Sequence, residues 1–480
     1  MISLLLILIP LVGAATAVAW PSERTRPLLL PITGTLSVIA ALWLMLAHPG
    51  VGDNAWLGLD PLARAVLPVI AVLFGVCSFH GLHYLRIRSE RPNRVFVSTL
   101  LALYALINAG IQARHLGLMW IAVEGATLAA VPLIHFNGTA RAFEATWKYL
   151  LVGGTGVALS LLGSFCLGYA SLLGGGSGDL TFATLMAQAS GFSRPWLLTG
   201  WVLILVGYGT KMGLAPMHTW KPDAYGEAPG IVGALLAGGV TTVAFVAVLR
   251  VRAVVALAGA GAVADRTLLY TGLFSLIVAA LFLLGTRDHK RMLAYSSVEH
   301  MGILSLGAAL GPVGVGAALF HTWTNSLTKG ALFLTSGTLR LGCGSSSLDE
   351  VRGTHALMPR TSTLFVTGLF AITACPPFGV FFSELRILAA GFATGHPVAM
   401  GILLACLLLA FLGLSRVIFG IVHGRPRNGA RARRKPLREG FALLAPPIVL
   451  LALSLALGIH TPESIQQLWS AAVAQLFPAP

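Results

Sequence analysis

Residues 196–220 read WLLTGWVLILVGYGTKMGLAPMHTW, and the first fifteen of them carry no charge. A run of this kind predicts a helix that crosses a lipid bilayer, because a span requires about 20 largely apolar residues. Lys211 follows directly on the uncharged run, and Pro216, which cannot donate a backbone hydrogen bond to a helix, comes five residues later. Since charge at membrane depth is costly, Lys211 is a candidate functional residue.

The whole chain has the composition of a membrane protein with many spans. Of its 480 residues, 56% are hydrophobic and only 10% are charged, whereas soluble domains have about 25% charged residues. The net charge of +15 therefore indicates basic loops that set membrane topology and not a nucleic-acid surface. The five cysteines form no C-x-x-C pair, and there is no G-x-G-x-x-G motif or Walker loop. We expect no cofactor, no metal and no catalytic residue in this chain.

Apolar segments long enough to cross a bilayer recur along the sequence. The first lacks the basic leader of a signal peptide, so it is interpreted as a retained helix. The predicted spans, fourteen in all, are residues 2–20, 28–48, 61–83, 95–113, 116–136, 146–173, 196–218, 230–249, 267–285, 293–311, 315–338, 361–390, 397–422 and 440–459.

The basic residues predict how these spans are oriented. Most of the 32 lysines and arginines fall in the loops after odd-numbered spans, including Lys221 and the arginine-rich run at 425–438. Arg250 and Arg252 are counted among the few in loops after even-numbered spans. Because basic loops stay in the cytoplasm, we expect a multi-pass protein of the inner (plasma) membrane with both termini on the outer, periplasmic side.

The spans also suggest an internal repeat. Spans 4–8 and 9–13 form two sets of five, and an odd number of helices gives two repeats of opposite orientation, as in many transporters. The fourth span of each set combines prolines with a charge, Lys211 in one and Glu384 in the other. The prediction is an all-α membrane protein with broken helices 7 and 12, divided into helices 1–3 (1–94), a first repeat (95–252), a second repeat (253–424), and a basic cytoplasmic loop with helix 14 (425–480).

Four ionisable residues inside predicted spans are the main candidates for the site: Glu124, Lys211, Lys329 and Glu384. Burial disfavours the charged form of such groups and an opposite charge nearby restores it, so a Glu–Lys pair that forms and breaks can move a proton. Each residue also has a purely structural interpretation, in which the lysines hold fixed ion pairs and Glu124 is a static counter-ion.

Span 11 adds a polar stripe to these charges. It reads FHTWTNSLTKGALFL, with His321, Asn325 and Lys329 at positions i, i+4 and i+8 on one helical face. Such a stripe can hold water and pass a proton along the helix, although a lone histidine is often only a core residue. Lys148 is an auxiliary candidate that could equally anchor the start of span 6 beside a basic loop.

Three long motifs resemble the antiporter-like subunits of respiratory complex I. They are TKMGLAPMHTWKPDAYGEAPGIVGALLAG (210–238), KRMLAYSSVEHMG (290–302) and FHTWTNSLTKGALFLTSG (320–337). Within that family, AYSSVEHMG and PPFGVFFSEL are most similar to the component F-type subunit of hydrogenase 4 and formate hydrogenlyase. The resemblance covers about residues 95–420.

The resemblance implies roles for the intramembrane charges. Glu124 and Lys211 would be the interacting pair of a first half-channel, with Lys329 the central lysine and Glu384 the terminal acid of a second. Redox energy would come from neighbouring membrane subunits of a hydrogenase-like or complex I-like assembly; the other expected partner is the lipid bilayer, and no nucleic acid is expected.

Two departures from the family pattern affect this proton route. Ala237 occupies a position that is His or Lys in many relatives, and Asn325 replaces a second histidine of span 11. Protons would then need ordered water, held by Thr241 and Thr242, or a substitute group such as His300.

The leading hypothesis is a non-catalytic, proton-translocating subunit of a redox-driven complex. A sodium/proton antiporter or an ion-coupled inorganic-carbon uptake subunit is the second, because carboxylates in a hydrated cavity could also bind Na⁺. The third is a structural subunit that does not conduct, for which the gap at Ala237 is the main support.

Overall fold

The computed structural model describes residues 4–47, 54–425 and 437–478, and within these ranges it is all-helical, without named strands. Most of the basic run at 425–438 lies outside the described residues. The helices are α1 (Leu5–Ala19), α2 (Leu29–Ala47), α3 (Pro61–Ile87), α4 (Arg94–Gln112), α5 (Leu116–Ile134), α6 (Ala140–Leu173), α7 (Phe182–Ala187), α8 (Arg194–Met212), α9 (Trp220–Glu227), α10 (Gly230–Leu235), α11 (Thr241–Val255), α12 (Gly261–Gly285), α13 (His289–Ala309), α14 (Gly311–Cys343), α15 (Pro359–Ile372), α16 (Gly379–Ala393), α17 (Pro397–His423), α18 (Phe441–Ile459) and α19 (Glu463–Leu476).

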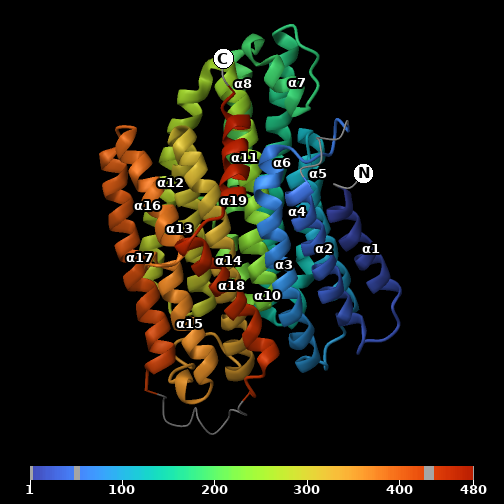
Figure 1. Cartoon of the computed structure of the whole chain (residues 1–480), viewed down its shortest axis with the longest axis vertical. Coiled ribbons are helices and arrows are strands. Elements are labelled where there is room, and N and C mark those ends of the chain that lie inside the picture. Colours follow the sequence, from blue (N-terminus) through green and yellow to red (C-terminus); the bar gives the residue numbers. More distant parts are fainter. Residues whose placement is uncertain (1–3, 48–53, 426–436, 479–480) are drawn as a thin grey trace.

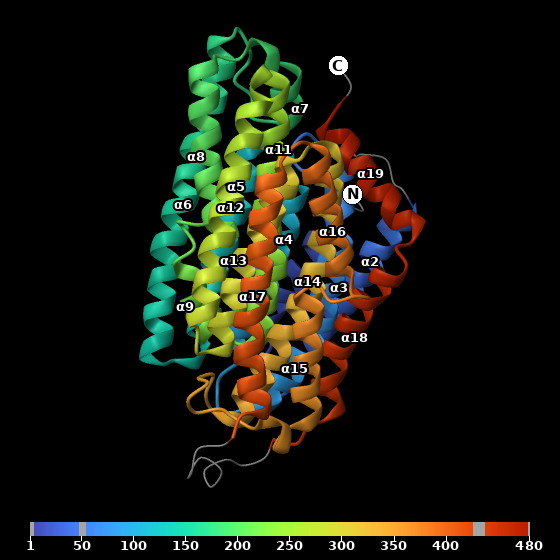
Figure 2. The same cartoon turned by 90° about the vertical axis from the view of Figure 1, so that its left-hand side faces the viewer.

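Most helices run along the long axis of the molecule (Figures 1 and 2). Eight helical segments of the described chain have the length and apolar composition to cross a membrane. The predicted spans 95–113, 397–422 and 440–459 coincide with α4, α17 and α18 to within one residue at each end. Helices suit this environment because they satisfy their own backbone hydrogen bonds where water is absent.

The 33-residue helix α14 lies at the centre of the second half of the chain. It packs against α13, α16 and α18, and it also contacts α10 and α3 from the first half. Its residues from Ala317 to Leu339 are all buried, which is unusual for a helix with so many polar side chains. A polar helix that is enclosed on all sides can line an internal route without exposing charge to lipid.

Helices α6 and α8 approach each other closely, because both have glycines at their interface. A Cβ atom added to Gly207 would lie 2.5 Å from the carbonyl oxygen of Gly156 and 2.6 Å from the backbone nitrogen of Ser160. Only glycine fits so close to another backbone. This contact fixes the second half of α8, and therefore Lys211, against α6.

A helix ends inside the predicted spans 196–218 and 361–390. Helix α8 ends at Met212, followed by Gly213 with a φ of 81°, and α9 begins at Trp220. Within the span predicted at 361–390, α15 ends at Ile372 and α16 begins at Gly379. Backbone groups between α8 and α9 have partners inside the protein: the Ala215 N–H donates to Ser275 Oγ at 2.9 Å, and Trp220 Nε1–H donates to the Thr210 carbonyl at 2.9 Å.

Three cations assigned to loops from the sequence lie in buried helices, and this corrects the loop assignment. Arg250 and Arg252 belong to α11 and pair with Asp60 at 2.8 Å and Asp265 at 2.7 Å. Lys221 lies in α9 and is fully buried. Hydropathy placed these residues in loops because it scores a buried cation as if it faced water.

Helix α19 was not predicted from the sequence, since its apolar residues lie on one face only. It contacts α3 and α14, and its Gln475 side chain joins the start of α3 by accepting the Leu62 N–H at 2.9 Å and donating to Asp60 at 3.0 Å. The Asp60 carboxylate is thus shared between α3, α11 and α19.

Candidate functional site

Four lysines of the described chain are buried: Lys211 in α8, Lys221 in α9, Lys290 in α13 and Lys329 in α14. Two buried carboxylates accompany them, Glu299 in α13 and Glu384 in α16, which are 4% and 5% exposed. Lysine and glutamate are almost never fully buried in proteins unless they are paired or functional.

Lys211 of α8 and Glu124 of α5 interact electrostatically. The Lys211 Nζ lies 4.8 Å from the centre of the Tyr149 ring, and no side chain or backbone oxygen of the described residues hydrogen-bonds to it. The Oε2 atom of Glu124 is likewise without a hydrogen-bond partner there. The pair is therefore close enough to interact but is not locked in a hydrogen-bonded ion pair, as a fixed helix bridge would be.

Gly153 of α6 provides the space that the Lys211 ammonium group occupies. A Cβ atom at Gly153 would lie 2.6 Å from Nζ, whereas a Cβ atom at the adjacent Gly154 would meet nothing within 4 Å. The glycine thus determines where the end of the lysine side chain can rest.

Replacing Gly153 with alanine is expected to displace the ammonium group without unfolding the protein, because the obstructing atom is the end of a flexible side chain. If Lys211 carries protons, transfer should slow by roughly threefold or more, since catalysis is sensitive to sub-ångström placement. Proton flux in sealed vesicles measures this. Gly154→Ala is the matched control, and equal flux in the two variants would show that the position of Lys211 does not matter.

Lys329 of α14 interacts electrostatically with Glu299 of α13. Its Nζ reaches the Leu293 carbonyl only at a weak 3.4 Å, and Glu299 accepts a long hydrogen bond of 3.3 Å from Ser296. The sequence had not singled out Glu299, although the signal was available. It is an acid inside the predicted span 293–311, which is the criterion that identified Glu124.

Beyond Lys329, a histidine pair connects α14 to α13 and α16. His321 lies 3.0 Å from His300 between ring nitrogens and 2.9 Å from Ser383 Oγ. The His300 Nδ1 is in turn 3.8 Å from a carboxylate oxygen of Glu384. The structure therefore brings His300, His321 and Glu384 together, as neighbouring groups in one chain of polar contacts.

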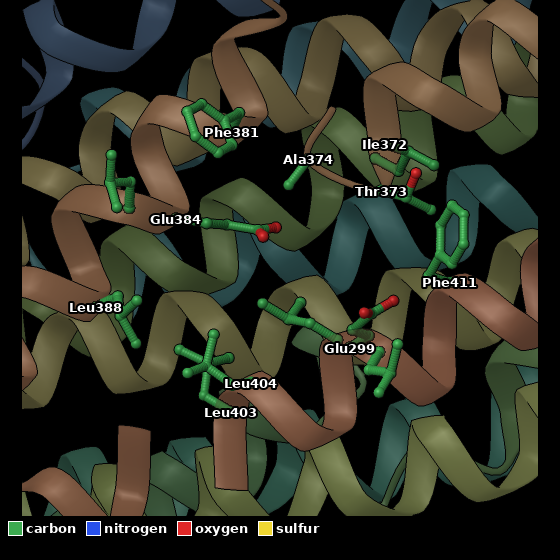
Figure 3. Close-up of a pocket in the computed structure, with 13 residues that line it drawn as sticks. Glu299, Ile372, Thr373, Ala374, Phe381, Glu384, Leu388, Leu403, Leu404 and Phe411 are labelled. Carbon is green, nitrogen blue, oxygen red and sulfur yellow. The ribbon is translucent and has the colours of Figure 1, made fainter. Parts of the chain in front are cut away.

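Glu299 and Glu384 also share a cavity of about 280 Å³. Figure 3 shows their carboxyl groups entering this space from different helices, among apolar side chains of α15, α16 and α17. Both oxygens of Glu384 lack a hydrogen-bond partner among the described residues. A buried carboxyl group without protein partners calls for a bound proton, water or an ion.

Lys221 connects the two halves of this arrangement. Its Nζ donates to the Met212 carbonyl, one residue after Lys211, at 2.5 Å, and it lies 5.6 Å from the centre of the Tyr225 ring. The Tyr225 ring packs edge-on against Phe333, one turn from Lys329 on α14. When both are protonated, Lys221 and Lys329 repel each other, and Lys221 likewise repels a protonated His300.

The auxiliary residues are more dispersed. Lys148 is half exposed and pairs with Glu144 at 2.6 Å and Asp223 at 2.8 Å, so the structure does not bring it to the buried groups. Thr241 and Thr242 donate their hydroxyls to the carbonyls of Ala237 and Gly238, in the segment that precedes α11. The Asn325 Oδ1 has no hydrogen-bond partner in the described chain.

Ala237 lies in a π-helical segment, η5 (Leu236–Val240), between α10 and α11. Ser326 of α14 donates to the Gly238 carbonyl of this segment at 3.3 Å. Segments of π-helix often occur at functional sites because they redirect backbone groups. Here the segment brings backbone oxygens, and not an ionisable side chain, next to α14.

Residues 113–410 match the family model described as NADH:quinone oxidoreductase/Mrp antiporter, transmembrane. The Hydrogenase-4 component F homolog of Methylacidiphilum infernorum is 34% identical over 376 residues, covering 78% of this chain and 77% of that protein. NADH-quinone oxidoreductase subunit N of Desulforudis audaxviator is 30% identical over 484 residues, covering 95% and 94%.

The fold is also found among solved structures. A chain of respiratory complex I from Thermus thermophilus superposes with a TM-score of 0.84 at 21% identity, covering 100% of both chains. The expected resemblance to antiporter-like subunits is thereby confirmed, and the chain belongs to the membrane family of NADH:quinone oxidoreductase and Mrp antiporter subunits.

Proposed function

We propose that this antiporter-like subunit translocates protons through its buried Glu and Lys side chains. The observation that carries the proposal is that Lys211, Lys221 and Lys329 are completely buried and hold no side-chain ion pair in the described chain, although Glu124 and Glu299 lie close enough to interact with Lys211 and Lys329. Charges that serve only for stability are normally paired, because an unpaired buried charge is costly. Groups that must gain and lose a proton cannot be permanently paired.

The proposed membrane arrangement follows the sequence prediction. The chain would cross the inner membrane fourteen times with both termini outside, and residues 95–252 and 253–424 would be inverted repeats with broken helices at α8–α9 and α15–α16. In this frame Glu124 corresponds to Glu299, and Lys211 to Glu384, by their helix positions within each repeat. The matching placement of buried charges in the two sets supports the assignment.

The proposed route begins at Glu124 and Lys211. A proton released by Lys211 would pass to the region of Lys329 and Glu299, then along His321 and His300 to Glu384. Each step is driven by the change in charge of the preceding pair, since an opposite charge nearby favours the protonated amine and its loss favours release.

Lys221 would bridge the gap that Ala237 leaves between the two halves. Its amine contacts the end of α8 and also interacts electrostatically with Lys329. A buried amine at this place can accept and release a proton, which the backbone oxygens of η5 cannot do. This assignment is proposed in place of the two sequence-based expectations, which were water held by Thr241 and Thr242 or a substitute group such as His300.

The partners would be other membrane subunits of a redox-driven assembly. The relatives reported above bear the names of a hydrogenase-4 component and a quinone oxidoreductase subunit, and this chain has no cofactor motif of its own. Energy would then reach the chain as a change of charge or position at the contact with a neighbouring subunit.

Ion flux in sealed vesicles that contain the native complex tests the proposal. We expect proton movement that depends on the electron donor and persists when Na⁺ is replaced by choline. Flux that requires Na⁺ would instead support the sodium/proton antiporter, and flux that requires bicarbonate would support inorganic-carbon uptake. Electron transfer without any ion movement would support the structural subunit.

A further inference from the structure

His300, His321 and Glu384 form a cluster of ligand atoms from three helices, α13, α14 and α16. One ligand atom from each residue lies within 4.8 Å of the other two, and all three residues are buried. Two imidazoles and one carboxylate form the ligand set of many zinc sites that keep a fourth position for water. Imidazole ligands select transition metals over Na⁺, Mg²⁺ and Ca²⁺, which prefer oxygen.

The distances between these atoms suit a tetrahedral ion. Zinc binds nitrogen and oxygen at about 2.0–2.2 Å, so neighbouring ligands in a tetrahedron lie roughly 3.3–3.5 Å apart. His300 Nδ1 lies 3.0 Å from His321 Nε2, at hydrogen-bond distance, and 3.8 Å from Glu384, and all three ligand atoms lie within 4.8 Å of one another. A metal ion would replace the hydrogen bond between the imidazoles, with the His300 proton carried on Nε2, which has no hydrogen-bond partner in the described chain. Small side-chain rotations would bring all three to a common centre.

The hydrogen bonds around His321 orient its ring for this role. Ser383 donates its hydroxyl to the Val380 carbonyl at 2.8 Å, so it accepts from His321 Nδ1–H at 2.9 Å. This leaves a lone pair on Nε2 directed at the cluster. A ligating histidine commonly donates its other N–H to such a partner, which fixes the tautomer.

The surrounding charges set the conditions for binding. Neither oxygen of Glu384 has a hydrogen-bond partner in the described chain, and Glu384 lines the cavity shown in Figure 3, where a fourth ligand such as water can be placed. Lys329 acts electrostatically on both imidazoles and opposes a bound cation, whereas Glu299 favours it.

We propose that His300, His321 and Glu384 bind one Zn²⁺ ion, and that the bound ion stops proton transfer. Binding uses the lone pairs of His321 and Glu384 that would otherwise accept protons, so transfer and metal occupancy exclude each other. The inhibitory part rests on the proposed function, while the metal site itself does not.

Metal binding is measured first, on the intact complex in lipid nanodiscs after treatment with a chelator. Titration with Co²⁺ should give the d–d absorption of a four-coordinate ion, which Zn²⁺ displaces, and zinc K-edge absorption should report two imidazoles and an oxygen ligand. Glu384→Gln and His300→Asn should each weaken the Co²⁺ signal by about tenfold or more. His80→Asn is the control, because His80 is a buried histidine bonded to Thr338 and lies outside the cluster.

Failure of the site and failure of the proposed function give different results. No saturable Co²⁺ spectrum, or the same spectrum in the Glu384 and His300 variants as in the unmutated complex, overturns the metal site. The zinc edge spectrum needs no variant, so it decides the matter if these variants do not assemble. Metal binding with proton flux that is unaffected by Zn²⁺ overturns the inhibitory part. Metal binding in a complex that moves no protons at all leaves the site standing and refutes the proposed function.

Discussion

Replacing Lys211 with methionine is expected to reduce proton flux through the complex by at least about tenfold. A general acid–base group typically contributes about 10²–10⁴-fold, and the smaller bound of tenfold allows for water that partly replaces the lost amine. Methionine has a similar volume, so the packing against Tyr149 and Gly153 should survive. Flux is measured in sealed vesicles at equal amounts of assembled complex.

The control for this experiment is Lys148→Met. Lys148 is also a lysine of the first half, but it is half exposed and already paired with Glu144 and Asp223. Surface ion pairs contribute about 0–1 kcal/mol to stability, so the complex should still assemble. Because Lys148 lies away from the buried groups, flux should change by less than roughly twofold. If Lys211→Met transports as well as Lys148→Met in an intact complex, Lys211 is structural and the non-conducting interpretation of the chain is favoured.

The sequence could predict the membrane helices and the first charges of the site for a simple physical reason. In lipid, each span must be apolar along nearly its whole length, so Glu124, Lys211, Lys329 and Glu384 stand out as exceptions. The burial of Lys211, Lys329 and Glu384 agrees with that expectation. Their roles in proton transfer remain predictions.

Lys221 could not be identified in this way, because it lies after a proline-containing segment that ends the apolar run. Hydropathy cannot distinguish a loop in water from a short helix folded back into the protein, as α9 is. The same limitation applies to Arg250 and Arg252. Their partners, Asp60 before α3 and Asp265 in α12, lie outside α11, so the sequence does not indicate the two ion pairs. The three-dimensional packing of α9 against α6 and α13 provides the missing information.

The second large effect is expected for Lys221→Met, which should reduce proton flux by about tenfold or more while the complex remains assembled. Position 237 is alanine and provides no ionisable group. The proposed link between Lys211 and Lys329 is therefore the amine of Lys221, which contacts the end of α8 and interacts with Lys329. Lys290→Met is a suitable control. Lys290 is also a buried lysine that donates to a backbone carbonyl, that of Ala228, but it lies outside the proposed route.

Lys221 also has a structural interpretation, since a cation that binds the Met212 carbonyl stabilises the end of α8. Lys221→Arg separates the two roles. Arginine keeps the positive charge and can donate to the same carbonyl, but it does not lose its proton in proteins. A proton carrier should therefore fail as arginine almost as completely as it fails as methionine. If Lys221→Arg restores flux while Lys221→Met does not, Lys221 acts as a fixed charge at the helix end, and water must carry the proton past Ala237.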